Sequence, residues 1–519
     1  MISKTVSPEW MVLAMLVLIK LLIHGFAGGN YELHRDAFLY LAMGDHPAFG
    51  YVSVPPFTGL LALILNQAGS DGVFWVRLLP ALAGAASLLV IGLLVREFGG
   101  RTWAMWIAGL AFLLSPAFLR SNVLFQPVSF NQFFWLLSAY FMVRMLKTKH
   151  PRYWLHLGIL WGVAFLNKYS IVFLALGFVI ALALTPARGL FRSRYLLYGA
   201  LAGLAITTPN LIWQYAHNWP VITHMRTLHE TQLVNVNITD FLMMQFLMNF
   251  HALAVWLAGL IFLLFLKAGK PYRALGYTFL AVLAILILLQ GKHYYSLGLY
   301  TPLFAAGGFA LEQVLFQRYR FLKPAIAASL SLLILPLVPF SLPVLSLEQM
   351  VAYGKATGSY GLEGALRWED GRVHSLPQDY ADMTGWQELG VKVTQTYLSL
   401  SPEEQARCMV YAENYGEAGA IRYYGRQFGL PEPVSFSDNF LLWAPDSIRG
   451  DILIYVNDEV EEISYFFSDV RPVGRINDPF ARESGLPVYL CRAPRNGFDQ
   501  FYQAKVAELK AEYQQPGIR

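Results

Sequence analysis

The chain has 519 residues, of which 56% are hydrophobic and only 14% charged, and its mean hydropathy is +0.43. Ordinary soluble proteins of this length do not combine these values, so the composition predicts a polytopic α-helical membrane protein. The net charge of +5 is the sum of two unlike parts. Up to Leu345 the chain has 23 Lys and Arg residues and nine Asp and Glu residues, and after Leu345 it has 16 Lys and Arg residues and 25 Asp and Glu residues. The basic residues form no stripe interleaved with aromatics, which excludes a nucleic-acid binder.

Eleven apolar runs, each near the length that a bilayer demands, follow one another in the first part. The first run also resembles a cleaved signal peptide, but Lys20 interrupts it and many runs follow, so we favour a membrane helix. The segment Phe57 to Leu65 is too short to cross and is expected to lie in the interface or to re-enter it. The predicted spans are residues 10–26, 72–95, 103–119, 126–146, 153–168, 169–186, 196–214, 241–266, 274–290, 294–311 and 324–345.

The distribution of basic residues predicts the orientation. Sixteen of the 23 basic residues of the first part precede the first run or fall in alternate connectors, which the positive-inside rule assigns to the cytoplasm. With a cytoplasmic N-terminus and an odd number of spans, the first outer loop, residues 28–57, lies outside the cytoplasm. We therefore expect residues 1–345 to form a membrane domain and residues 346–519 a soluble domain outside the cytoplasm.

The first outer loop gathers ionisable residues in an otherwise apolar region. Three of the nine acidic residues of the first part, Glu32, Asp36 and Asp45, fall within fourteen positions. His34 and Arg35 lie among them, and the loop closes on a Pro-Pro pair. A passive connector would not show this concentration, so we identify the loop as the candidate active site.

Two lysines are expected at the outer membrane face. Lys168 ends a predicted span in the stretch LNKYS, and Lys292 begins KHYY, which continues with His293, Tyr294 and Tyr295. A cation beside apolar helices needs a partner, which a lipid-linked phosphate or a lipid headgroup could supply, and the sequence leaves both readings open. The two tyrosines could equally be ordinary interfacial aromatic residues.

The second outer loop, residues 215–240, contains His217, His224, His229 and Glu230. No pair of them has the tight spacing of metal ligands, so we expect a hydrogen-bonding loop rather than a metal site. No glycine-rich phosphate loop occurs in the chain, which argues against chemistry on ATP or nucleotide sugars.

After about Ser346 the pattern becomes that of a small soluble α/β domain. The short apolar runs CMVYAE, DILIYVND and GLPVYLCR read as buried strands, and helix-like stretches at 416–428, 459–467 and 498–513 alternate with them. Cys408 and Cys491 each lie in a predicted strand, and a disulfide and two buried thiols both remain open.

Several of these stretches together resemble one family over nearly the full chain: the Asp-x-x-x-Tyr of the first loop, LNKYS, GKHYY, QDYADMTGWQELG and AENYGEAGAIRYYG. The chain is similar to the membrane enzymes of glycosyltransferase family 39, the bacterial relatives of protein O-mannosyltransferases and of the aminoarabinose and galacturonic acid transferases that modify lipid A. The resemblance implies the GT-C fold, a sugar donor carried by a polyprenyl phosphate, and a location in the bacterial inner membrane with residues 346–519 in the periplasm. It also implies that Asp36 is the catalytic aspartate and that Tyr40 is the family's tyrosine four residues on.

The chain departs from the family at two positions. Ala37 stands where many relatives have an acidic residue, and Asn131 stands where an acidic residue is common. The first departure weakens a scheme with two carboxylates, and the second weakens a metal held between loops, so a divalent metal is left open and no cofactor is assigned. Asp36 is then expected to act alone or with Asp45.

These considerations predict transfer of a sugar from a polyprenyl-phosphate carrier to a hydroxyl group of lipid A, another glycan or a protein, by direct displacement. A helix cap or a salt bridge to Arg35 is the structural alternative for Asp36. The expected roles are general base for Asp36, phosphate binding for Lys168, Lys292 and Arg35, and donor or acceptor contact for His34, Tyr40, Asp45, His293, Tyr294 and Tyr295.

Two other functions are compatible with parts of this pattern. A lipid-linked glycan flippase or transporter would predict paired halves with broken helices, and we find no such repeat. A polymerase or ligase of lipid-linked glycans differs mainly in the size of its donor, which the sequence does not reveal.

Overall fold

The computed structural model describes residues 7–231, 233–315, 317–448, 451–495 and 497–513. The chain divides into two compact units. The first comprises residues 1–28, 77–211 and 225–344, and the second comprises residues 29–76, 212–224 and 345–519. The first outer loop thus falls almost wholly in the second unit, together with residues 345–519, and the division into a membrane domain, residues 1–345, and a soluble domain, residues 346–519, stays a prediction.

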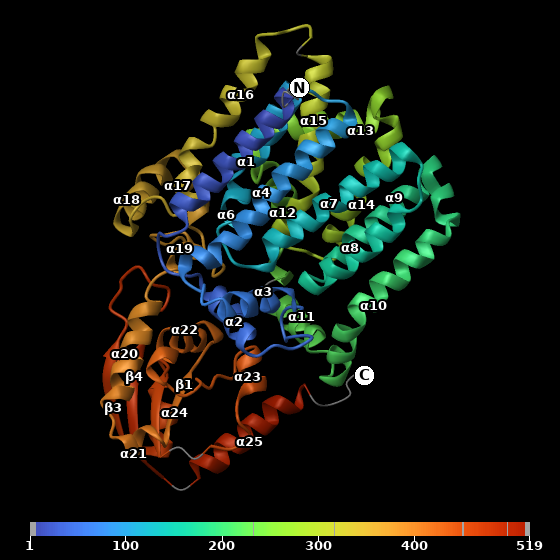
Figure 1. The fold of residues 1–519 in the computed structure, drawn as a ribbon. Coiled ribbons are helices and arrows are strands. Elements are labelled where there is room, and N and C mark those ends of the chain that lie inside the picture. Colours follow the sequence, from blue (N-terminus) through green and yellow to red (C-terminus); the bar gives the residue numbers. More distant parts are fainter. Residues whose placement is uncertain (1–6, 232, 316, 449–450, 496, 514–519) are drawn as a thin grey trace, which may run out of the picture. The chain divides into compact units, whose positions relative to one another are not determined.

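The first unit is built from helices, which Figure 1 shows in the colours from blue to yellow. Two of them, α4 and α10, extend by a few residues into the second unit. The helices are α1 (Pro8–Ala27), α4 (Val73–Phe98), α5 (Thr102–Leu113), α6 (Pro116–Ser121), α7 (Pro127–Thr148), α8 (Tyr153–Asn167), α9 (Ile171–Ala183), α10 (Arg194–Ala216), α12 (Ile238–Leu247), α13 (Leu253–Phe265), α14 (Arg273–Leu288), α15 (Tyr300–Val314), α16 (Leu322–Leu332) and α17 (Val338–Ser341).

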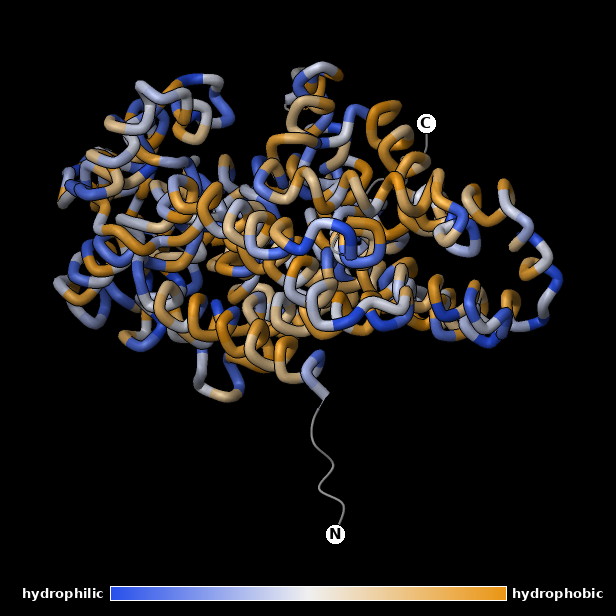
Figure 2. Tube along the Cα trace, turned by 90° about the horizontal axis from the view of Figure 1, so that it is seen from above, coloured by the Kyte–Doolittle hydropathy of each residue, from blue (hydrophilic) through white to orange (hydrophobic). Residues whose placement is uncertain are grey.

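Each predicted apolar run contains helix, but not every run is one straight span. By length and composition, five helices of the described residues could cross a membrane, or up to seven if each of two bent helix pairs is one span. The run 103–119 breaks into α5 and α6 at Ser115-Pro116, because proline cannot donate the helical hydrogen bond at that point. The polytopic helical fold is confirmed, as the long hydrophobic stretches in Figure 2 illustrate, while the count of eleven spans stays a prediction.

Glycines bring some helices of the first unit into backbone contact. A Cβ atom on Gly158 of α8 would collide with the backbone of Gly199 in α10. In the same way, a Cβ atom on Gly307 of α15 would collide with the backbone of Val255 in α13. Small residues let helices approach closely in lipid, where van der Waals contact replaces the hydrophobic effect as the driving force.

The second unit contains a four-stranded sheet of order β1-β2-β4-β3. β1 (Cys408–Ala412) runs parallel to β2 (Ile452–Val456), and β4 (Pro487–Pro494) is antiparallel to both β2 and β3 (Phe467–Arg475). One face of the sheet buries Met409, Leu453 and Cys491 against helix α25. The α/β architecture therefore has its own hydrophobic core.

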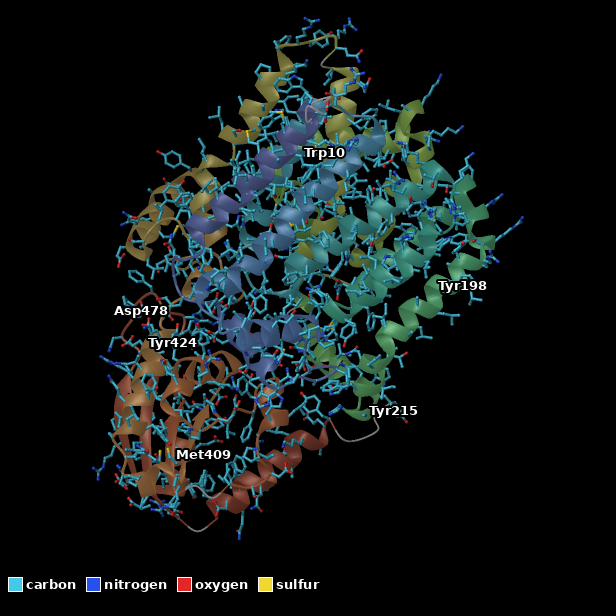
Figure 3. All side chains as sticks on the ribbon, viewed as in Figure 1. Trp10, Tyr198, Tyr215, Met409, Tyr424 and Asp478 are labelled. Carbon is cyan, nitrogen blue, oxygen red and sulfur yellow. The ribbon has the colours of Figure 1, made fainter. Side chains whose placement is uncertain are left out.

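The remaining helices of the second unit come from all three chain segments that form it. Glycines allow α2, from the first outer loop, to pack tightly on two neighbours: Gly44 lies against the backbone of Ala62 in α3, and Gly419 of α22 lies against Phe38. Figure 1 shows α22 beside α2, and Figure 3 labels Tyr424, which packs near the Phe38 ring. These helices are α2 (Arg35–Asp45), α3 (Phe57–Gln67), α11 (Pro220–Thr231, shared with the first unit), α18 (Leu347–Thr357), α19 (Gln378–Ala381), α20 (Trp386–Leu398), α21 (Pro402–Gln405), α22 (Tyr415–Gly425), α23 (Asn439–Trp443), α24 (Val460–Phe466) and α25 (Phe498–Ala511).

The three strands predicted from the sequence correspond to β1, β2 and β4, but β3 was missed. β3 is a largely exposed edge strand with a register shift between Pro472 and Gly474, so it lacks the apolar alternation of a buried strand. The two cysteines are free thiols. Because β2 lies between β1 and β4, Cys408 and Cys491 are two strands apart, about 10 Å by strand spacing, which is too far for a disulfide.

Candidate active site

The first turn of α2 presents the predicted catalytic residues. His34 is the N-cap, and its Nδ1 accepts the backbone N–H of Asp36 at 3.2 Å. Because His34 occupies the cap, Asp36 is not the capping residue, and it lies in the first turn, where the helix dipole favours a carboxylate. The start of α2 is also held by the connection between α19 and α20, far along the chain, since the Arg35 N–H donates to the Asp382 carbonyl at 3.0 Å.

The carboxylate of Asp36 is held by a residue from the C-terminal stretch. The Tyr415 hydroxyl donates a hydrogen bond to Asp36 Oδ1 at 2.8 Å. The Arg35 guanidinium lies 4.8 Å from the centre of the same tyrosine ring, a cation–π geometry. The Asp36 side chain remains 26% exposed, so a substrate hydroxyl can approach it.

Arg35 is surrounded by acidic groups of the second unit. Burial lowers its pKa, but Tyr415, Asp382, Asp36 and Glu483 together raise the pKa above its ordinary value. Burial raises the pKa of Asp382 and of Glu483, and in each case the charge of Arg35 opposes that rise. The predicted role of Arg35 in phosphate binding is therefore joined by a clear structural role in balancing buried carboxylates.

His34 faces two further carboxylates. Its Nε2 lies 3.8 Å from Asp382 Oδ2 and 4.0 Å from Asp379 Oδ1. Since Nδ1 accepts a backbone hydrogen bond, the neutral ring carries its proton on Nε2, toward these carboxylates. His34 thus links the start of α2 to Asp379 in α19 and to Asp382, which directly follows α19.

Asp36 and Asp45 lie at opposite ends of α2. Asp45 is nine residue steps after Asp36, which correspond to about 13 Å of helix, so the two carboxylates do not form one pair. Asp45 is paired with Arg422 of α22 and accepts a 2.8 Å hydrogen bond from Asn66 Nδ2. Tyr40 is buried one turn after Asp36 and shares its face of the helix.

Another carboxylate, that of Asp438, lies close enough to Asp36 for their charges to interact. The sequence did not single out Asp438. Burial raises the pKa of Asp438, the Ser53 hydroxyl and the charge of His224 lower it, and the charge of Asp36 adds to the rise. Asp438 has φ 50° and caps α23 by accepting the N–H of Asn439. Neither Asp438 nor Tyr415 stands out by local pattern, although Tyr415 falls within the AENYGEAGAIRYYG stretch that carries the family resemblance.

The other predicted site residues belong to the first unit. Lys168 follows the end of α8, and its Nζ lies 5.0 Å and 5.9 Å from the ring centres of Tyr295 and Tyr294. Lys292 precedes a short 3-10 helix that begins at His293. The charge of Lys292 acts on Lys168, so the structure brings these two predicted cations into one neighbourhood.

Among the residues that the structure describes, no group of three or more His, Cys, Asp and Glu could hold a metal ion. Two histidines of the second outer loop have other partners: His217 stacks on Trp213, and His229 contacts Gln290 Oε1 at 3.2 Å.

Comparison with known proteins agrees with the resemblance predicted from the sequence. Residues 53–213 match the model of a family described as dolichyl-phosphate-mannose-protein mannosyltransferase. The lipid A galacturonosyltransferase RgtD of Rhizobium johnstonii is 28% identical over 192 residues, which are 36% of this chain and 40% of the relative. The match thus spans less than half of that relative's length.

Solved structures match over a greater length. ArnT from Cupriavidus metallidurans bound to undecaprenyl phosphate is similar with a TM-score of 0.63 and 16% identity, covering 93% of this chain and 98% of that one. The structure of the same ArnT in the apo state is similar with a TM-score of 0.60 and 17% identity, covering 93% of this chain and 97% of that one. The expected GT-C fold, that of ArnT, is therefore confirmed.

Proposed function

We propose that this protein is a glycosyltransferase of the bacterial inner membrane that moves a sugar from a polyprenyl-phosphate carrier to a hydroxyl group of a periplasmic acceptor. The observation that carries the proposal is the carboxylate of Asp36, fixed by Tyr415 and still accessible, in a chain with the fold of ArnT. ArnT was solved with a polyprenyl phosphate, RgtD is named for lipid A, and the matching family is named for a lipid-linked sugar. These names support a lipid-linked donor, and lipid A, another glycan or a protein remain the acceptor classes.

The chemistry requires a base on the acceptor side. A hydroxyl group becomes a good nucleophile at the anomeric carbon if a positioned carboxylate takes its proton as the bond forms. In the proposed mechanism Asp36 is that base: the acceptor oxygen bonds to the anomeric carbon, the carbon–phosphate oxygen bond breaks, and the proton moves to Asp36. The polyprenyl phosphate leaves with the electron pair of the broken bond.

The leaving phosphate requires positive charge. Cations placed where charge develops stabilise the transition state, and they do so most strongly away from bulk water. Lys168 and Lys292 are the proposed donors to this phosphate. The structure supports this role because Lys168 contacts aromatic rings and, among the described residues, forms no ion pair with a carboxylate.

The proposed orientation places the N-terminus in the cytoplasm and residues 346–519 in the periplasm, with eleven spans. It is supported by the asymmetry of the basic connectors. A reporter that is active only in the periplasm, fused after Arg519, is expected to be active. Activity of a cytoplasmic reporter alone at that position would reverse the orientation and remove the periplasmic mechanism.

The function is tested by mass spectrometry of envelope lipids, glycans and proteins from cells with and without the protein. Loss of one sugar from one acceptor class in the deletion strain, restored by the wild-type gene and not by Asp36→Asn, is the expected result. Accumulation of an unflipped lipid-linked glycan would favour a flippase instead, and loss of polymer length would favour a polymerase or ligase.

A further inference from the structure

We infer that Tyr415 is a positioning residue for Asp36, so that α22 of the C-terminal stretch completes the candidate active site. This inference rests on the proposed role of Asp36 as the base. It assigns a catalytic purpose to residues 345–519, which would otherwise be read as an accessory domain.

The contact between the two side chains is direct and has a defined direction. The Tyr415 hydroxyl lies 2.8 Å from Asp36 Oδ1. Burial and the negative charge of Asp36 raise the pKa of Tyr415 well above its ordinary value. The phenol therefore stays protonated, and its O–H donates the hydrogen bond to the carboxylate. A hydrogen bond to a charged acceptor is stronger than one between neutral groups, so it fixes the rotation of the carboxylate.

The tyrosine itself is held on a rigid support. It is the first residue of α22, whose N-cap Asn414 accepts the N–H groups of Gly416 and Glu417 at 2.9 Å and 3.1 Å. Its ring carries the Arg35 guanidinium on one face. A Cβ atom on Gly416 would lie 3.3 Å from Cβ of Arg35, so the glycine lets α2 and α22 approach at this point.

Loss of the hydroxyl alone has a specific expected effect. In Tyr415→Phe the ring remains for Arg35 and for packing, and only the hydrogen bond to Asp36 disappears. Without that bond the carboxylate is free to rotate out of the geometry that proton abstraction needs, so kcat should fall while KM for the donor stays close to its wild-type value.

The experiment compares the purified full-length wild-type protein with Tyr415→Phe and with a matched control, Tyr423→Phe. Tyr423 is on the same helix, packs on Phe38 and donates a 3.0 Å hydrogen bond to the Asp71 carbonyl, away from Asp36. The probe is turnover as a function of the concentration of a polyprenyl-phosphate sugar, with melting temperature recorded. We expect Tyr415→Phe to lose about tenfold or more in kcat with little change in KM for the donor or in melting temperature, while Tyr423→Phe keeps wild-type turnover.

The Asp36→Asn variant distinguishes a failure of the positioning role of Tyr415 from a failure of the proposed role of Asp36 as the base. If Asp36→Asn is inactive but Tyr415→Phe has wild-type kcat, the positioning role is wrong and the proposed function stands. If Tyr415→Phe and Tyr423→Phe lose turnover equally and in step with melting temperature, Tyr415 is only a packing residue. If Asp36→Asn retains near-normal turnover, the proposed base itself is wrong, whatever Tyr415 does.

Discussion

Arg422 of α22 forms an ion pair with Asp45 at the last turn of α2, while Tyr415, at the first turn of α22, holds Asp36 at the first turn of α2. Two polar contacts and the Gly419–Phe38 contact between them therefore fix α2 along its length. The base proposed for the reaction sits on a helix whose orientation is set by residues more than 370 positions away in the sequence.

Asp45 is expected to be structural rather than substrate-binding. Arg422 also donates to Glu432 Oε1 at 2.7 Å, so Arg422→Met leaves two acidic groups without this partner. We expect Asp45→Asn to cost about 1–2 kcal/mol of unfolding free energy and Arg422→Met somewhat more. Chemical denaturation with a turnover assay checks this. A large fall in kcat for Asp45→Asn at unchanged stability would instead return Asp45 to the substrate site.

The close approach of α22 to α2 predicts intolerance of a side chain at Gly419. A Cβ atom there would lie 2.8 Å from Cβ and 3.0 Å from the carbonyl carbon of Phe38. Gly419→Ala should therefore cost about 1–3 kcal/mol through overpacking and should lower turnover, since α2 carries Asp36. Gly358→Ala is the matched control because its Cβ atom meets nothing within 4 Å. Equal melting temperatures for the two variants would contradict this packing.

Lys168 and Lys292 are expected to serve the phosphate of the donor. Methionine keeps the length and apolar character of each side chain but removes its charge. Lys168→Met and Lys292→Met should each lower donor binding or turnover by about tenfold or more, the effect of one lost charge-assisted contact. Lys267→Met is the control, because Lys267 is an exposed residue of a predicted cytoplasmic connector. Normal use of a polyprenyl-phosphate sugar by both variants would make these lysines membrane anchors only.

The buried carboxyl group of Glu417 predicts a pH dependence of stability. Burial and the nearby charge of Glu483 raise the pKa of Glu417 from 4.5 to about 8. Between these values the folded chain holds a proton that the unfolded chain releases, so the free energy of unfolding falls as pH rises from about 4.5 to 8. Melting temperatures across this range should fall less for Glu417→Gln, which cannot ionise. A steeper fall in the variant would refute the assignment.

Much of the framework follows from local patterns in the sequence. Apolar runs predicted the helices of the first unit and the strands β1, β2 and β4, because burial on both faces leaves a continuous apolar signature. The cluster of charges around Asp36 stood out for the opposite reason, since an apolar segment does not retain ionisable residues without a partner or a function.

The features of the fold and of the candidate site that the sequence did not predict depend mainly on contacts between residues far apart in the chain. Nothing local to Tyr415 reveals that its hydroxyl reaches Asp36, 379 positions away, and the same holds for Arg422 and Asp45. Helix breaks, such as the one at Ser115-Pro116, divide apolar runs without changing their hydropathy, so an apolar run does not by itself give a number of spans. The exposed edge strand β3 has no apolar face for a pattern to detect.

The most direct test of the account is the turnover of purified Asp36→Asn with a polyprenyl-phosphate sugar, measured beside the wild type with melting temperature and donor binding. Asparagine keeps the size of the side chain and the acceptor for Tyr415, and the helix cap is His34, so stability and donor binding should be preserved. Because the amide cannot take the acceptor's proton, turnover should fall by about a hundredfold or more. Near-normal turnover by a stable Asp36→Asn protein would contradict the claim that this aspartate is the catalytic base.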